Sequence, residues 1–339
     1  MIIDGFPDRK ITVQDKEYLY FGGTSYLGIA SHPEFQQLLY ENIKKWGTFY
    51  GSSRNANVAL RIYEEAEQQF AVTLGAEASL TVSSGTLAGK LALAQLSKET
   101  TCFFHYPKSH PAIIAPESNP LFLNGALNPR LCTSVKEKVV ITADAILGLE
   151  VKPTNFDFLE SISPTKTVTL LVDESHSLGV VGSKGEGVFN TINTKNVARK
   201  ILIASLGKGL GLAGGIIAGD THFIEALRQE PSFVSASGMS PAYLATYIAG
   251  SKIYEEQREK LNSNLELINS KWMMRAGYLF DKEYPVIYSN DAAIFTTLLE
   301  NGIVITSFAY PTYKKTMNRI VITANHTEND LIKLIQNLK

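Results

Sequence analysis

Cysteine is scarce in this chain of 339 residues, which contains only two. Cys102 and Cys132 occur in unrelated contexts, with neither a C-x-x-C pair nor a Cys/His cluster around them. This usage argues against a disulfide scaffold and against a zinc site. The sequence therefore predicts a protein of a reducing compartment that holds no metal.

A charge imbalance and long apolar runs are absent as well. The chain has 32 Lys and Arg against 33 Asp and Glu, so a net charge of -1 gives no electrostatic reason to expect nucleic acid or a membrane as partner. Apolar stretches such as Ile201–Ala204 are too short to cross a bilayer. The start Met1–Gly5 lacks the basic patch and apolar run of a signal peptide. We expect a cytoplasmic protein.

Short β-branched runs alternate with longer segments of helical period in the first two thirds of the chain. This alternation predicts an α/β fold, with a mostly parallel sheet flanked by helices. The expected strands are 101–106, 138–142, 168–173, 200–205 and 215–219, and the expected helices are 34–46, 63–74 and 87–96.

The pattern changes after Pro241. One long helix is expected from 242 to about 276, followed by strands 284–288, 303–306 and 319–323 and by helices 291–301 and 328–338. These elements predict a smaller α+β domain. The expected organisation is an N-terminal arm and helix (1–45), a large domain (46–240), and a linking helix with a small C-terminal domain (241–339).

Asp173 ends an apolar run, and His176 follows three residues later. Ligands of open α/β sheets bind at the carboxyl ends of the strands, where an acid can bond a protonated ring nitrogen and the histidine can reach the same ligand. An Asp that caps a helix and a merely exposed His are the alternative. This short motif alone leaves both open.

Lys208 lies in a glycine-rich loop that follows the strand expected to end at Ser205. Small neighbours let a flat cofactor approach the backbone, and a lysine in such a pocket can lose its proton and attack an aldehyde. Ser205 is suited to contact a phosphate. The alternative is a glycine-rich turn with a solvated lysine.

A third polar turn, Ser84-Gly85-Thr86, opens an apolar helix. Free backbone N–H groups and the helix dipole make such a start an anion site. An ordinary Ser/Thr N-cap is the alternative. The position of this turn ahead of the Asp173 and Lys208 elements favours a phosphate cradle.

Together these blocks resemble the fold-type I pyridoxal-phosphate (PLP) enzymes, and within them the α-oxoamine synthases, a group that includes 8-amino-7-oxononanoate synthase and 2-amino-3-ketobutyrate CoA ligase. Tyr26–Pro33 resembles the opening N-Y-L-G-L-x-x-H-P, and Asp173–Gly187 resembles D-[DE]-[AS]-H-[SG]-x-G-x-x-G-x-x-G-x-G. Ser205–Gly211 resembles the Schiff-base segment. The resemblance runs from Tyr18 to nearly the C-terminus and implies PLP as cofactor.

The resemblance implies a role for each catalytic position. Lys208 would hold the cofactor as a Schiff base, Asp173 would pair with its pyridine nitrogen, and His176 would donate a hydrogen bond near its phenolic oxygen. His110 would stack on the ring. A core or surface histidine is a rival interpretation of His110, because Pro111 follows it.

The phosphate and the substrate have implied residues too. Those around the phosphate are Ser84, Gly85, Thr86 and Ser205, with Ser237 reaching it across the interface of a homodimer with shared active sites. Arg319 would bind the substrate carboxylate, with a solvated arginine as the alternative. Arg54 and Thr24 would complete the substrate site.

The departures from the family pattern concern the substrate. Only seventeen residues precede Tyr18, and Thr24-Ser25 replaces the asparagine of the opening block. Thr142–Glu150 replaces T-E-G-V-F-S-M-D-G, so that the acid and the serine of that segment are expected to be missing, while Arg54 survives in an altered loop.

Three functions follow, in order of preference. The first is condensation of a small amino acid with an acyl-CoA. The second is an aminotransferase acting on an amino acid, and the third is a non-catalytic protein that uses the fold to bind a ligand, since one fold hosts many functions.

Overall fold

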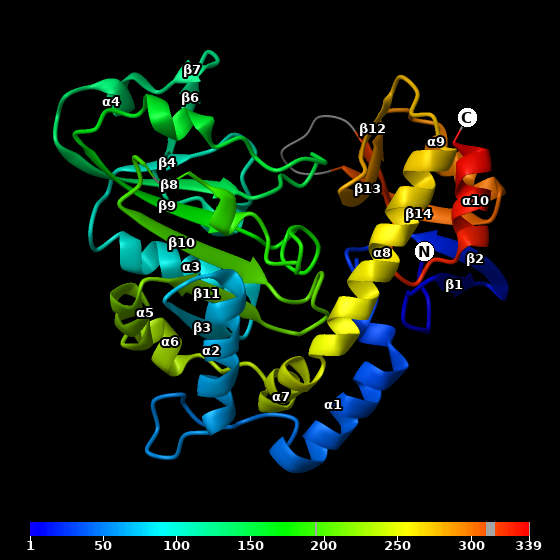
Figure 1. Ribbon diagram of the computed structural model, residues 1–339, viewed down its shortest axis with the longest axis horizontal. Coiled ribbons are helices and arrows are strands. Elements are labelled where there is room, and N and C mark those ends of the chain that lie inside the picture. Colours follow the sequence, from blue (N-terminus) through cyan, green and yellow to red (C-terminus); the bar gives the residue numbers. More distant parts are fainter. Residues whose placement is uncertain (194, 310–315, 339) are drawn as a thin grey trace.

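A computed structural model describes residues 1–193, 195–309 and 316–338. Figure 1 shows two bodies, a large sheet covered by helices and a smaller sheet, with the long helix α8 (Ser251–Lys271) running between them. Among the helices of these residues, none is both long and apolar enough to cross a bilayer.

The large sheet has seven strands among the described residues, in the order β3-β11-β10-β9-β8-β4-β5. Their bounds are β3 Ala78–Val82, β11 Gly215–Gly219, β10 Arg199–Ser205, β9 Lys166–Asp173, β8 Glu137–Asp144, β4 Phe103–His105 and β5 Asn119–Pro120. Strands β10, β9, β8, β4 and β5 pair in parallel, and β11 runs antiparallel to both its neighbours. The predicted fold class, an α/β fold with a mostly parallel sheet, is confirmed.

Helices cover both faces of this sheet, as buried parallel strands require. Helix α3 (Gly85–Leu96) packs with α5 (Thr221–Arg228) and α6 (Pro231–Ser235) in one apolar cluster, which includes Leu171 and Ile203 of the sheet. Helices α1 (Pro33–Trp46), α2 (Arg61–Leu74) and α7 (Pro241–Ala249) contribute to the other, larger core. The short α4 (Pro129–Cys132) and the hairpin β6 (Phe122–Leu123) and β7 (Ala126–Leu127) lie outside the sheet.

The single long helix expected over 242–276 is wrong. It divides at Gly250 into α7 and α8, and α8 ends at Lys271. A side chain at Gly250 would meet the Thr246 carbonyl at 2.9 Å and the Phe35 ring at 3.4 Å, so the chain turns where it presses on α1.

The smaller sheet has the order β1-β2-β14-β15-β13-β12 in the described residues. Its strands are β1 Lys10–Val13, β2 Lys16–Phe21, β14 Ile303–Ala309, β15 Thr316–Val321, β13 Tyr284–Ser289 and β12 Tyr278–Asp281, with helices α9 (Ile294–Glu300) and α10 (Glu328–Asn337). The segment expected to be an arm therefore supplies two strands, since β2 pairs in parallel with β14. Strand β15 also begins and ends earlier than the expected 319–323.

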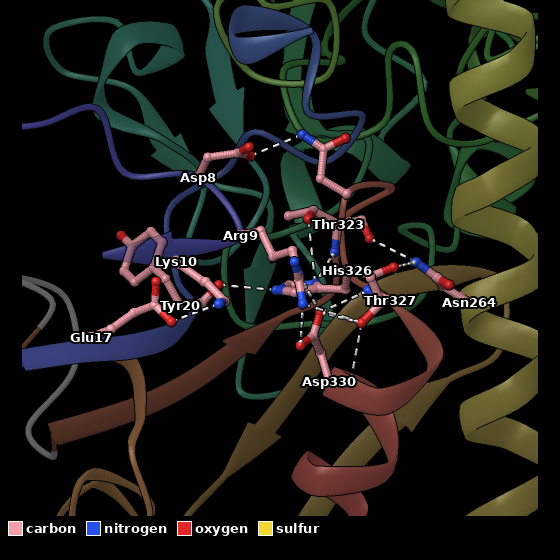
Figure 2. A network of polar contacts seen from close by, with 11 residues as sticks. Asp8, Arg9, Lys10, Glu17, Tyr20, Asn264, Thr323, His326, Thr327 and Asp330 are labelled. Carbon is pink, nitrogen blue, oxygen red and sulfur yellow. Dashed lines mark hydrogen bonds and ion pairs between the residues drawn. The ribbon is translucent and has the colours of Figure 1, made fainter. Parts of the chain in front are cut away.

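A polar network fastens the N-terminal strands to the end of the chain (Figure 2). Arg9 binds the Asp330 carboxylate with an N–O distance of 3.0 Å, and His326 contacts the Tyr20 carbonyl at 3.0 Å. The His326 ring stacks on Phe21 at 3.9 Å. This attachment fixes the end of β2, from which the chain continues at Gly22.

Candidate active site

The site lies at the carboxyl edge of the large sheet. Asp144 and Asp173 are the last residues of β8 and β9 and stand opposite each other in register, and Ser205 ends β10. Side chains alternate along a strand, so Asp173 and Ser205 share the face of Leu171 and Ile203, against which α3 packs. The sheet thus brings two carboxylates and a serine to the face that carries the start of α3.

Lys208 follows in the loop between β10 and β11, half-buried among these groups. Burial lowers the pKa of its amine, the charges of Asp173 and Asp144 raise it, and the charge of Arg319 lowers it. Burial dominates, so the amine loses its proton more easily than a surface lysine does. A depressed pKa is what an amine needs to act as nucleophile.

The turn before α3 is shaped by close packing. The Ser84 side chain caps the helix by accepting from the Leu87 N–H at 3.2 Å. A side chain at Gly85 would meet Ser205 Cα at 2.8 Å, and one at Gly215 would overlap the Ser84 carbonyl. Ser84 and Thr86 are exposed, which leaves the first turn of α3 open to an anion.

His176 is held by a tyrosine that sequence reasoning gave no role. The Tyr26 hydroxyl lies 2.9 Å from Nδ1 of His176 and 3.3 Å from the Tyr284 hydroxyl. Burial, and the charges of Lys208 and Arg319, lower the pKa of His176 well below its ordinary value. A neutral ring that accepts from Tyr26 at Nδ1 carries its proton on Nε2, where it can donate.

His110 reaches the same site from the loop before the short 3₁₀ helix Pro111–Ile113. Its Nδ1 accepts from the Ala112 N–H at 3.2 Å, and the imidazole is otherwise exposed. The charges of Asp173 and Lys208 both act on its pKa, which burial lowers overall. The structure therefore brings His110 together with the predicted lysine and aspartate.

Asp144 corrects one expectation. The acid of the family pattern was expected to be missing from segment 142–150, but Asp144 supplies a carboxylate there: it is 5% exposed, and its Oδ2 accepts from the His110 N–H at 2.9 Å. The acid stands one residue later than in the family pattern, so matching letter by letter overlooks it. Burial and the neighbouring Asp173 charge raise the pKa of Asp144 to about 7.

Glu174, the second residue of the D-E-S-H block, has a folding role. Its buried carboxylate accepts from Ser177 and, at 3.0 Å, from the Val188 N–H. Gly187 has a φ of +83°, and a side chain there would overlap this carboxylate. The glycines of the motif thus allow the loop 177–188 to close around Glu174.

Arg319 lies on β15 of the smaller sheet, and it contacts the segment that contains Thr24. Arg319 donates to the Gly23 carbonyl at 2.9 Å, and its Nε is buried without a hydrogen-bond partner. No carboxylate of the described residues pairs with it. Thr24 follows Gly23 and is half-buried. The guanidinium charge acts on Lys208, His176 and Tyr26, so it lies within electrostatic reach of the site.

Among the described residues, neither Arg54 nor Ser237 forms a hydrogen bond or an ion pair with Lys208, Asp173 or His176. Arg54 is buried in an ion pair with Glu67 at 3.0 Å and stacks on the Tyr63 ring at 3.7 Å. These contacts are those of a structural arginine, and its predicted substrate role has no support in them. Ser237 is exposed between α6 and α7. Its reach across a dimer interface stays a prediction.

The sequence model of class I and II aminotransferases matches residues 153–338, which is more than half of the chain. The chain belongs to the class I and II aminotransferase family. It is 28% identical to 8-amino-7-oxononanoate synthase of Petrotoga mobilis, over 95% of this chain and 87% of the relative. It is also 25% identical to serine palmitoyltransferase of Bacteriovorax stolpii, over 96% and 83%. The resemblance to the α-oxoamine synthases is confirmed.

Solved structures give the same fold. Serine palmitoyltransferase from S. paucimobilis with a bound PLP-myriocin aldimine superposes with a TM-score of 0.81 at 17% identity, covering 99% of this chain and 90% of that one. The 8-amino-7-oxononanoate synthase from Francisella tularensis superposes with a TM-score of 0.71 at 23% identity, covering 94% and 96%.

Proposed function

We propose that this chain is a PLP-dependent acyltransferase of the α-oxoamine synthase type, which condenses a small amino acid with an acyl-CoA. The observation that carries the proposal is the convergence of Lys208, Asp173, His176 and His110 at one sheet edge. Relatives named 8-amino-7-oxononanoate synthase and serine palmitoyltransferase, matched over nearly the whole chain, support the reaction type.

The residues fit PLP on three counts. A half-buried amine with a depressed pKa, Lys208, suits an aldehyde. The first turn of α3 presents free N–H groups and exposed hydroxyls to a phosphate, and Gly85 and Gly215 let this turn pack against Ser205 and the Ser84 carbonyl. Asp173, 5% exposed, suits a protonated ring nitrogen.

Each residue then has a definite task. When bound, PLP accepts the electrons of a bond that breaks at the substrate Cα. Asp173 would keep a proton on the ring nitrogen of PLP. His176 would donate a hydrogen bond from Nε2 near the phenolic oxygen of PLP. Lys208 would hold the PLP aldehyde and, as a free amine, would remove or return the proton at the substrate Cα.

The amino-acid carboxylate is assigned to Arg319. Its guanidinium has a buried Nε without a partner and is not neutralised by any carboxylate among the described residues. A charge-assisted hydrogen bond to a substrate carboxylate would satisfy that group. Thr24, adjacent to the Gly23 carbonyl that Arg319 binds, is the proposed neighbour of the same substrate.

We also propose a cytoplasmic homodimer with shared active sites. The large apolar side chains Tyr40, Phe49 and Val58, on α1 and the loop after it, are each more than half exposed in the single chain. A partner that covers them would remove apolar surface from water. Light scattering of the purified protein tests the dimer, and a monomeric mass would contradict it.

Two substrates distinguish the reactions. The PLP-loaded protein is incubated with glycine, alanine or serine, with and without acyl-CoA. Release of free thiol that depends on both substrates is the expected result. A pyridoxamine spectrum formed with amino acid alone would instead indicate the aminotransferase that the family name suggests, and a spectrum that no amino acid changes would favour a binding protein.

A further inference from the structure

Asp144 is a buried carboxylate in the site that the proposed reaction leaves without a task. It faces Asp173 across the β8–β9 pair, and neighbouring strands lie about 4.8 Å apart. Thr142, two residues earlier on the same face, has a buried hydroxyl without a hydrogen-bond partner, and the buried Ser109 hydroxyl lies beside Asp144. A polar patch thus continues from Asp173 toward His110.

The contact with His110 is specific. Asp144 Oδ2 accepts from the backbone N–H of His110 at 2.9 Å, while the His110 ring caps the next turn through Ala112. Both ends of the residue are therefore fixed, the backbone by Asp144 and the imidazole by Ala112. Without the carboxylate, that backbone N–H would lose its partner.

Charged and polar groups meet Asp144 from three elements. Asp173 faces it from β9, Lys208 from the loop after β10, and His110 with Ser109 from the loop before Pro111. The pKa of Asp144 is raised to about 7, so the group is an anion in the alkaline range in which a lysine amine titrates. Its charge then opposes loss of the Lys208 proton.

We propose that Asp144 is a positioning residue of this site, whose carboxylate anchors the backbone of His110 and places a second negative charge within reach of the Lys208 amine. The inference rests on the proposed PLP function. The proposal also explains why the acid of segment 142–150 stands at residue 144 rather than 143. At the end of β8, residues 142 and 144 are on the face of Asp173, and residue 143 is on the opposite face.

Two variants separate the anchor from the charge. Asp144→Asn keeps an oxygen that accepts from the His110 N–H but has no charge, whereas Asp144→Ala loses both. Asp157→Asn removes a carboxylate from the exposed 3₁₀ helix Asp157–Ser161 and serves as the control.

The charge is tested on the protein without PLP. Lys208 is methylated with formaldehyde and cyanoborohydride across a pH series, and the extent is read from its peptide by mass spectrometry. The midpoint of reactivity moves to lower pH in both Asp144 variants and stays in place in Asp157→Asn. An unchanged midpoint in Asp144→Asn would overturn the proposed charge effect.

The anchor is tested by PLP affinity, measured by equilibrium dialysis. Both variants lack the charge, so the anchor is read from the comparison between them: Asp144→Ala binds PLP about tenfold more weakly than Asp144→Asn, the cost of one lost hydrogen bond. Equal affinity of the two variants overturns the anchor. If the wild type binds no PLP, the proposed function is wrong. The methylation series does not depend on PLP and still tests the charge effect. If Asp144→Ala does not fold, Asp144→Leu, which also lacks an acceptor and fills more of the space, takes its place in the comparison with Asp144→Asn.

Discussion

His326 offers the sharpest test of how the two ends of the chain are joined (Figure 2). It is 4% exposed, its Nδ1 accepts from the Thr323 N–H at 2.9 Å, and its Nε2 lies 3.0 Å from the Tyr20 carbonyl. Acceptance at one nitrogen and donation at the other require a neutral ring. Burial lowers the pKa of His326 to about 4.

The sign of the pH effect follows from this pKa. In the unfolded chain the ring takes up its proton near pH 6.5, and in the folded chain only near pH 4. The unfolded state binds more protons in between, so the His326 contribution to the free energy of unfolding falls as pH falls, by about 3 kcal/mol in total. Asp144 and Glu174, whose raised pKa values are about 7, act in the opposite direction.

A comparison with His326→Gln isolates the histidine, because the other groups are common to both proteins. Glutamine does not titrate, so the gap in unfolding free energy between wild type and variant narrows by about 3 kcal/mol between pH 7 and pH 4. Urea unfolding at a series of pH values measures the gap. The exposed His222→Gln is the control and follows the wild type. A gap for His326→Gln that stays constant across this range would refute the reasoning.

Three further predictions concern the site. Gly215→Ala forces a side chain into the Ser84 carbonyl and lowers PLP affinity at least about tenfold by titration, whereas Gly148→Ala, which has open space, does not. Tyr26→Phe deprives His176 Nδ1 of its donor, so kcat falls about tenfold while PLP affinity is kept; an unchanged kcat contradicts this role. Arg319→Gln raises the KM for the amino acid about 10- to 100-fold, and a KM equal to that of the wild type rules out the carboxylate assignment.

The sequence predicted what local pattern determines. Asp173 and Lys208 stand at or just beyond the ends of apolar strands. The carboxyl ends of parallel strands meet at one edge of the sheet, so these residues come together regardless of the sequence that connects the strands. The polar turn Ser84-Gly85-Thr86 was recognisable for the same reason. Strand β11 was predicted with the bounds that the structure has.

Long-range contacts account for what was missed. Nothing near β2 in the sequence indicates that it pairs with β14, nearly three hundred residues later. Tyr26 acquires its role only when β13 brings Tyr284 beside it and the large domain brings His176. The division at Gly250 depends on Phe35 of another helix. Asp144 was overlooked because a position-by-position comparison with the family motif looks for the acid at residue 143. Side chains alternate along a strand, so residue 144, and not 143, shares the face of residue 142.

The most direct test of the account is the identity of the residue that holds PLP. The purified protein is incubated with PLP, reduced with borohydride and mapped by peptide mass spectrometry, with Lys208→Ala as the matched variant. The expected result is a visible absorbance band that reduction abolishes, and a pyridoxyl group on Lys208 that Lys208→Ala lacks. An unmodified Lys208 peptide in the reduced wild type would contradict it.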